Sequence, residues 1–246
     1  MIREAIEFLL SKQANFETYV DGYGKEHIGY DGKHFRITAD TISKGFELTT
    51  LQGVVDYISE NIDAEEHESE LTIHIISPSK VKIYTDLNQD LARTEVVSSN
   101  AILSGFQMDH WYDSETFMIH LLSNFVNTDD LKKLVQLIGT ISVDEGVTTE
   151  DDGFTQKVTA RKGVHLKGNE LLPPRVQLSP IRTFVEVEQP ISEFSLRVKE
   201  ERGIIYGALF QADGGYWRIE AMQNIKNYLQ ENLESLDIYN KIKILM

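Results

Sequence analysis

The sequence predicts an α+β fold of two packed subdomains with antiparallel sheets, a helical hairpin in the middle and an amphipathic carboxy-terminal helix over a small β-sheet. Two patterns support this prediction. Segments of alternating apolar and polar residues are joined by short turns, which favours antiparallel pairing, and the helices are grouped instead of alternating with single strands. The chain of 246 residues is also long enough to bury two cores.

The amino-terminal elements are a helix and a hairpin. Apolar residues at helical spacing predict an amphipathic helix over residues 2–14. The turn sequence Asp31-Gly32 predicts a hairpin that joins strands at residues 28–30 and 34–38.

A capped helix and a second hairpin come next. Thr49 or Thr50 is suited to cap an amphipathic helix that ends before an acidic loop. Alternating apolar residues then predict paired strands at 71–75 and 81–84, and a third strand is expected near 94–97.

The middle of the chain is predicted to form a helical hairpin. Asp113 or Ser114 is suited to cap its first helix, and Thr128 its second. An acidic stretch rich in turn residues follows at 144–153, and we place the domain boundary there.

We therefore divide the chain into an acidic α+β domain at residues 1–150 and a β-rich domain with a carboxy-terminal helix at residues 151–246. In the second domain the alternation predicts strands at 154–164, 176–178, 184–187, 194–198 and 204–210. The turn Asp213-Gly214-Gly215 precedes the last helix, which is expected to close over this sheet. The predicted apolar face of that helix consists of Ile219, Met222, Ile225, Leu229, Leu233 and Leu236.

Charge is distributed unevenly along the chain. Residues 1–150 contain 26 acidic and 11 basic residues (11 − 26 = −15), whereas residues 151–246 contain 13 of each. The acidic excess is typical of a solvated surface that keeps a protein in solution. It also fits a protein that imitates nucleic-acid charge and occupies the basic groove of a host enzyme.

A locally basic stretch is the strongest functional signal in the sequence. It contains a single acid, Glu170, and six basic residues: Lys157, Arg161, Lys162, Lys167, Arg175 and Arg182. Clustered cations on strands can neutralise phosphates, so this stretch is a candidate nucleic-acid surface. A basic strand can equally meet the acidic region of the same chain or of a second copy, which makes a homo-oligomer the expected assembly.

The sequence contains no constellation that indicates catalysis or a cofactor. The absence of cysteine excludes disulfides, thiolate metal sites and thiol nucleophiles, and fits a reducing compartment such as the cytoplasm. The amino terminus is not typical of a secretory signal, and no segment has the length of apolar sequence that a membrane helix needs. Asp109 and His110 could converge with His120 on a metal, but a structural role is the better interpretation for one side chain on a loop and one on a helix. We expect neither an enzyme nor a metal site.

Three sequence segments of the carboxy-terminal region resemble a known family. They are the run from Gln177 to Pro190, the sequence Phe194-Ser-Leu-Arg197, and the sequence from Ala208 to Trp217. They are similar to the carboxy-terminal half of the bacteriophage- and prophage-encoded YfdQ-like family, over about residues 150–232. The resemblance implies a phage accessory protein that acts in the host cell, and it implies no catalytic residue.

Seven residues in these segments are candidate functional residues of unassigned role: Glu186, Gln189, Arg197, Asp213, Gly214, Gly215 and Trp217. Structural roles explain most of them, with Asp213 and the two glycines forming a tight turn. Our first functional hypothesis is a self-associating accessory protein that binds nucleic acid or a protein through the basic stretch. The alternatives are an acidic inhibitor directed at a host protein, of the anti-defence or DNA-mimic type, and a structural subunit of a ring or shell.

Overall fold

The computed structural model describes residues 4–7, 16–20, 22, 26–30, 33–36, 44–63, 70–87, 91–103, 105–143, 147–151, 156–162, 165–172 and 175–246. The chain divides into two units, Met1–Lys44 and Gly45–Met246. The boundary predicted at residue 150 lies inside the second unit. Both hydrophobic cores of that unit combine residues from before and after position 150, so the chain cannot be divided there without splitting each core.

The first unit contains a three-stranded antiparallel sheet of β1 (Phe16–Val20), β2 (Glu26–Tyr30) and β3 (Lys33–Arg36). Tyr30 pairs with Lys33, so β2 and β3 form the predicted hairpin with a two-residue connection. β1 was not predicted from the sequence. Residues 4–7 are helical, and the rest of the helix predicted over residues 2–14 lies outside the described residues.

A five-stranded sheet forms the first half of the second unit, in the order β15-β5-β6-β7-β4. Its strands are β4 (Phe46–Leu48), β5 (Leu71–Ser77), β6 (Lys80–Thr85), β7 (Glu95–Asn100) and β15 (Ile242–Leu245). The predicted hairpin and third strand are confirmed as the antiparallel centre, β5-β6-β7. The two edge strands differ from the expected antiparallel pairing, because β15 pairs with β5 and β4 with β7 in parallel.

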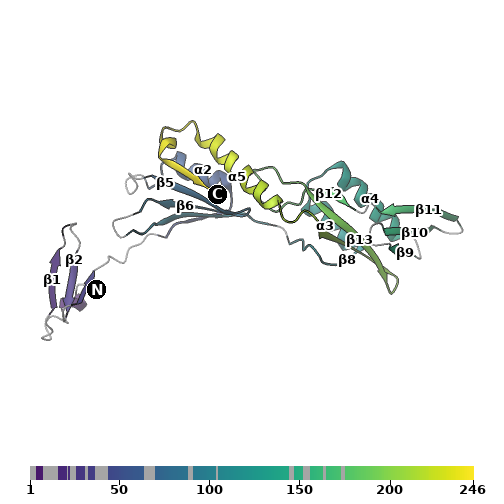
Figure 1. Ribbon diagram of the computed structural model, residues 1–246, viewed down its shortest axis with the longest axis horizontal. Helices are drawn as coiled ribbons and strands as arrows, with labels where there is room; N and C mark the ends of the chain where they lie inside the picture. The colour runs from purple at the N-terminus through teal and green to yellow at the C-terminus, as the bar shows by residue number, and fades with distance from the viewer. Residues whose placement is uncertain are drawn as a thin grey trace. The chain divides into compact units, whose positions relative to one another are not determined.

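Two helices cover this sheet, as Figure 1 shows for α2 (Leu51–Ser59) and α5 (Trp217–Leu233). Thr50 caps α2, because its Oγ1 accepts a hydrogen bond from Gly53 N at 3.1 Å. The residues of α5 that join the core lie four positions apart at Ile225, Leu229 and Leu233. None of the described helices has the length and apolar character of a membrane span.

The carboxy-terminal helix lies over a different sheet from the one expected. We predicted that α5 closes over the strands that precede it, but its buried side chains belong to the core of the β5-β6-β7 sheet. The predicted apolar face is confirmed at five of its six residues, because Ile225, Leu229 and Leu233 are buried in that core and Met222 and Leu236 pack against it. Ile219 is the exception and is 58% exposed. A helix buries one stripe of side chains, and the stripe observed here includes Ala221 rather than Ile219.

The second half of the unit is an antiparallel sheet of four strands, in the order β12-β13-β14-β8. Its strands are β8 (Tyr112–Asp113), β12 (Val176–Leu178), β13 (Ser192–Glu201) and β14 (Ile204–Gln211). The predicted helical hairpin, α3 (Ser114–Asn124) and α4 (Asp129–Val143), packs on one face of this sheet. Asp113 caps α3 through Thr116 N at 2.9 Å, and Thr128 caps α4 through Leu131 N at 3.2 Å.

A further antiparallel sheet has the order β11-β10-β9. It consists of β9 (Val147–Asp151), β10 (Gln156–Lys162) and β11 (His165–Leu172). The strand predicted at 154–164 is thus confirmed as β10, whereas β9 and β11 were not predicted. This sheet carries four of the six residues of the predicted basic surface.

The strand predicted at residues 184–187 is wrong, because the chain from Ile181 to Ile191 is a partly buried loop. Phe184 is 1% exposed and Val185 is 73% exposed, so buried and exposed side chains do alternate here, but they lie in a turn and not in a strand. The loop joins the two halves of the unit: Thr183 Oγ1 donates to Pro78 O, and Glu186 Oε1 accepts from Leu51 N at 2.8 Å.

Candidate functional site

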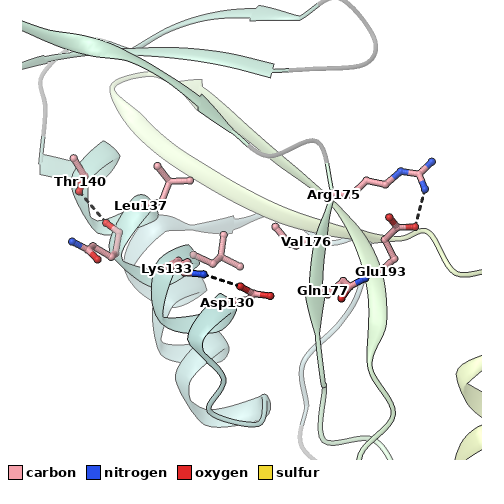
Figure 2. Close-up of a pocket in the computed structure, with 10 residues that line it drawn as sticks. Asp130, Lys133, Leu137, Thr140, Arg175, Val176, Gln177 and Glu193 are labelled. Carbon is pink, nitrogen blue, oxygen red and sulfur yellow. Dashed lines mark hydrogen bonds and ion pairs between the residues drawn. The ribbon is translucent and has the colours of Figure 1, made fainter.

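A pocket of about 750 Å³ lies between helix α4 and the edge of the four-stranded sheet (Figure 2). Its apolar lining consists of Leu134, Leu137 and Val176. Its polar lining consists of Asp130, Lys133, Gln136, Thr140, Arg175, Gln177 and Glu193. The pocket therefore combines an apolar surface with polar groups that surround it, as small-ligand and peptide sites do.

The helix wall of the pocket follows from the periodicity of α4. Leu131, Leu134, Ile138 and Ile141 are buried against the sheet, which turns the side of Lys133 and Leu137 toward the pocket. The opposite wall is β12, which pairs with β13 alone in the sheet. An edge strand has backbone N–H and C=O groups on one side that the sheet does not pair.

Two ion pairs flank the pocket, one on each wall. Asp130 and Lys133 are 3.2 Å apart on α4, and Arg175, just before β12, is 2.7 Å from Glu193 of β13. Both pairs are partly exposed, and such pairs contribute little to stability. Their four charges cancel, so the lining is neutral in a chain whose net charge is −15.

The predicted basic surface is not a single surface among the described side chains. Arg175 pairs with Glu193 at the pocket, whereas Arg182 is largely buried in the loop from Ile181 to Ile191 and pairs with Asp213. Lys157, Arg161 and Lys162 lie on β10 and Lys167 on β11, and their side chains lie outside the described part of the structure. Two of the six cations are thus neutralised within their own chain.

The backbone register places two of the remaining cations, Arg161 and Lys162, at one end of the β10-β11 hairpin. Arg161 and Lys162 pair with Leu166 and His165, next to the connection between the strands. Lys157 lies at the other end of β10, opposite Glu150 of β9. Arg161 and Lys162, near the β10-β11 turn, are therefore paired with no acidic residue in this register, whereas Lys157 is.

Two of the motif positions, Asp213 and Trp217, come together around the largely buried guanidinium of Arg182. Arg182 lies with its Cζ 3.8 Å from the centre of the Trp217 ring and its Nη2 3.9 Å from Asp213 Oδ2. Ser192 Oγ accepts a hydrogen bond from Arg182 and donates one to Asp213. The side chains of Arg182 and Asp213 are only 12% and 14% exposed. This arrangement is a structural cation–π and ion-pair cluster.

Burial acts on both charged members of this cluster. Burial lowers the pKa of Arg182 to about 10 despite the nearby Asp213, so the guanidinium keeps its charge at neutral pH. Burial also opposes the charge of Asp213, but the hydrogen bonds that this carboxylate accepts outweigh burial and lower its pKa. Arg182 Nε and Trp217 Nε1 are buried without a hydrogen-bond partner among the described residues.

The two glycines serve the turn before α5, as the structural interpretation proposed. Gly214 and Gly215 have φ values of 63° and 83°, a conformation that favours glycine. Asp213 Oδ1 accepts a hydrogen bond from Gly215 N at 2.9 Å and holds the turn closed. The N-cap of α5 is Tyr216, which makes no side-chain capping bond.

Gln189 organises the loop from Ile181 to Ile191. Its Oε1 accepts hydrogen bonds from Arg182 N at 3.0 Å and Thr183 N at 3.2 Å. Its Nε2 donates to Phe184 O at 2.9 Å and Val187 O at 3.2 Å. The side chain is buried, so one amide satisfies four backbone groups that would otherwise lack partners.

Replacing Gln189 by alanine should lower the free energy of unfolding by about 2 kcal/mol, because buried backbone groups lose their partners. Urea unfolding followed by circular dichroism measures the change. Gln223→Ala is the matched control, since Gln223 lies exposed on α5 and should leave the free energy of unfolding unchanged. Equal stability of the two variants would contradict this role.

The remaining motif positions have separate places. Glu186 Oε1 accepts from the first backbone amides of α2, and its Oε2 is buried without a partner among the described residues. Arg197 lies on β13, where it pairs in the register with Ala208. Neither residue contacts the Arg182–Asp213–Trp217 cluster in any described interaction.

The histidines that were weighed as metal ligands do converge, but on a tyrosine. The rings of His110 and His120 each lie 4.7 Å from the ring of Tyr112. Within the described part of the chain, no group of three His, Asp or Glu side chains has the spacing of a metal site.

Sequence reasoning identified one pocket residue, Arg175, and missed the others. The lining from α4 consists of positions on an ordinary amphipathic helix, so no local signal distinguishes it. No protein-family model matches this chain, and no curated protein or solved structure shows significant similarity to it.

Proposed function

We propose that this chain is a non-enzymatic binding protein that holds an extended segment of a protein partner in the pocket between α4 and β12. One observation carries the proposal: a neutral, partly apolar pocket lies directly beside the edge strand of a sheet. An extended peptide can add to such an edge as a further strand, because its backbone pairs with the free side of β12.

The lining supports a peptide more than a nucleic acid. Leu134, Leu137 and Val176 provide an apolar surface for one side chain of the segment. Lys133 and Arg175 are already paired with Asp130 and Glu193, so the pocket offers no excess positive charge to phosphates. The volume of about 750 Å³ falls in the range of known ligand sites and suits a short segment.

The segment can come from a second copy of this chain or from another protein, and the recognition chemistry is the same. The first source corresponds to the self-association that the sequence predicts. The resemblance to phage-encoded proteins favours an accessory role in an infected bacterium. An inhibitor directed at a host protein and a shell subunit remain predictions of the sequence.

Peptides selected from a random display library on the wild-type protein should lose at least tenfold in affinity for Leu137→Arg. The arginine places a charge on the apolar lining, where it cannot be solvated as it is in water. Fluorescence anisotropy gives the dissociation constants. Ile219→Arg is the control, since it makes the same kind of change at an exposed position of α5.

Hydrogen exchange locates the bound peptide. Strand addition predicts slower exchange for amides of residues 176–178 when a selected peptide is bound. Peptides that bind Leu137→Arg as tightly as wild type, or protection confined to another strand, would contradict the proposal. Sedimentation of Leu137→Arg and Ile219→Arg without peptide identifies the source of the bound segment. If the segment comes from a second copy of this chain, Leu137→Arg should lower the mass of the assembly and Ile219→Arg should not.

A further inference from the structure

The four-stranded sheet has a second face, on the side opposite α3 and α4. The inward positions of β13 and β14, among them Phe194, Leu196 and Leu209, are buried in the core with those helices. Side chains alternate along a strand, so the intervening positions point the other way. On β13 these are Ser195, Arg197 and Lys199, and the register pairs them with Phe210, Ala208 and Tyr206 of β14.

Three aromatic rings gather on this outward face around one lysine. Trp111, just before β8, lies with its ring centre 6.1 Å from that of Phe210. Lys199 Nζ is 4.8 Å from the centre of the Trp111 ring and 5.5 Å from that of Tyr206. All three rings are partly exposed, and the Lys199 side chain is 43% exposed.

The charge of this face differs from that of the whole chain. Four acids lie on it or at its rim: Glu193, Glu201, Asp113 opposite Tyr206, and Glu200 at the β13-β14 turn. Glu193 and Glu201 are paired with cations at 2.7 Å and 3.3 Å. Four basic residues lie on it or at its rim: Arg175, Arg197, Lys199 and Arg202. Acids and bases are thus equal in number, so the face is neutral in a chain of net charge −15. Exposed ion pairs are weak, so a phosphate can replace Glu201 at Lys199.

We propose that this aromatic face, formed by Trp111, Lys199, Tyr206 and Phe210, binds single-stranded nucleic acid. Partly exposed rings on an open antiparallel sheet stack unpaired bases, and neighbouring cations neutralise the backbone. Lys199 lies against two rings, so a phosphate bound at its ammonium brings the adjoining bases within reach of both. A duplex keeps its bases stacked on each other and cannot use the rings, so single strands are the favoured ligand.

This site differs from the basic stretch predicted from the sequence. It shares Arg175 with that stretch and otherwise uses residues from β13, β14 and the segment before β8. Arg175 and Glu193 at its rim also line the peptide pocket, but Trp111, Lys199, Tyr206 and Phe210 do not, and the α4 wall of the pocket lies against the other face of the sheet. The two binding activities can therefore be tested independently.

The test is fluorescence anisotropy with a fluorescein-labelled oligothymidylate of about 12 nucleotides, a length that one sheet-based site covers. Wild-type protein should bind this probe, and Trp111→Ala should weaken binding roughly tenfold through the loss of one stacked base. Trp111→Phe should retain most of the affinity, because it keeps a ring. Lys199→Ala should reduce the slope of log affinity against log salt concentration by about 0.7, the value for one phosphate contact of a single strand.

Matched controls separate this site from unspecific binding. Tyr216→Ala removes an exposed ring and Lys132→Ala an exposed cation, both away from the face, and neither should change affinity. A duplex of the same length should bind more weakly than the single strand. Circular dichroism checks that each variant is folded, and Lys199→Ala decides the test if Trp111→Ala fails to fold.

Three outcomes would overturn the proposal. The first is that the folded full-length protein fails to bind the oligonucleotide at low salt. The second is that Lys199→Ala keeps the wild-type affinity and salt slope. The third is that binding is lost only when Arg161 and Lys162 are replaced. The last result would assign nucleic-acid binding to the β10-β11 hairpin instead.

Discussion

Replacing Asp213 by alanine should lower the free energy of unfolding by about 3–5 kcal/mol, because it leaves a buried guanidinium without its counter-ion. Asp213 is the acidic partner of Arg182, which lies between the Trp217 ring and the Ser192 hydroxyl. The same carboxylate accepts hydrogen bonds from Gln211 Nε2 at 2.7 Å and from Gly215 N. The substitution removes all of these interactions together.

Urea unfolding of wild type and Asp213→Ala measures this effect. Asp129→Ala is the control, because Asp129 pairs with Lys132 on the exposed surface of α4 and should leave stability unchanged. Adding Arg182→Met to Asp213→Ala should restore part of the loss, since the buried charge is then removed as well. A loss below about 1 kcal/mol in Asp213→Ala would mean that water solvates Arg182 in the folded protein.

The pH dependence of the unfolding free energy should reveal the ionisation of the Asp213 carboxylate. The pKa of Asp213 is lowered in the folded protein, so its contribution is present at pH values above the pKa of an unfolded aspartate. That contribution disappears as the pH falls through the lowered folded-state pKa. The difference in unfolding free energy between wild type and Asp213→Asn should therefore shrink in acid, below about pH 4. A difference that is constant with pH would contradict the ionised state of this group.

Replacing Phe117 by alanine should cost about 3–5 kcal/mol of unfolding free energy, because it opens a cavity in the core of the four-stranded sheet. Phe117 is 0% exposed and lies directly against Gly207 of β14. A Cβ atom added at Gly207 would lie 2.4 Å from Phe117 Cδ1 and 2.6 Å from its Cε1. The ring thus fills the space that the missing side chain leaves.

This contact predicts a compensating pair of substitutions. Gly207→Ala alone should cost about 1–3 kcal/mol by overpacking. Combined with Phe117→Leu, it should cost less than the sum of the two single changes, since the smaller side chain leaves room for the new methyl group. Urea unfolding of the four proteins forms a double-mutant cycle. Additive costs would show that the two positions do not contact each other in solution.

The fold class and most individual elements could be predicted because they depend on neighbouring residues. Thr50, Asp113 and Thr128 cap the helices that they precede, as their side chains reach amides two or three residues further on. The hairpin of β5 and β6 likewise follows from alternation and a short turn. The prediction failed at residues 184–187, where alternation in a loop held by Gln189 resembles a strand.

Position in the sequence was a poor guide to the candidate sites. The basic stretch was grouped because its residues are close in sequence, but Arg175 and Arg182 have different partners, Glu193 and Asp213. The aromatic face was missed because Trp111 meets Lys199 and Phe210 only through the pairing of β8 and β14.

The sequence by itself determined the α+β class, the helix caps and the antiparallel hairpins, because hydrogen bonds between near neighbours and the period of apolar residues specify them. Only the tertiary structure decided that α5 covers the β5-β6-β7 sheet, that β15 pairs with β5 in parallel, and that Arg182 is buried. Each of these depends on a contact between residues distant in the chain, and the local pattern around either residue is compatible with many partners.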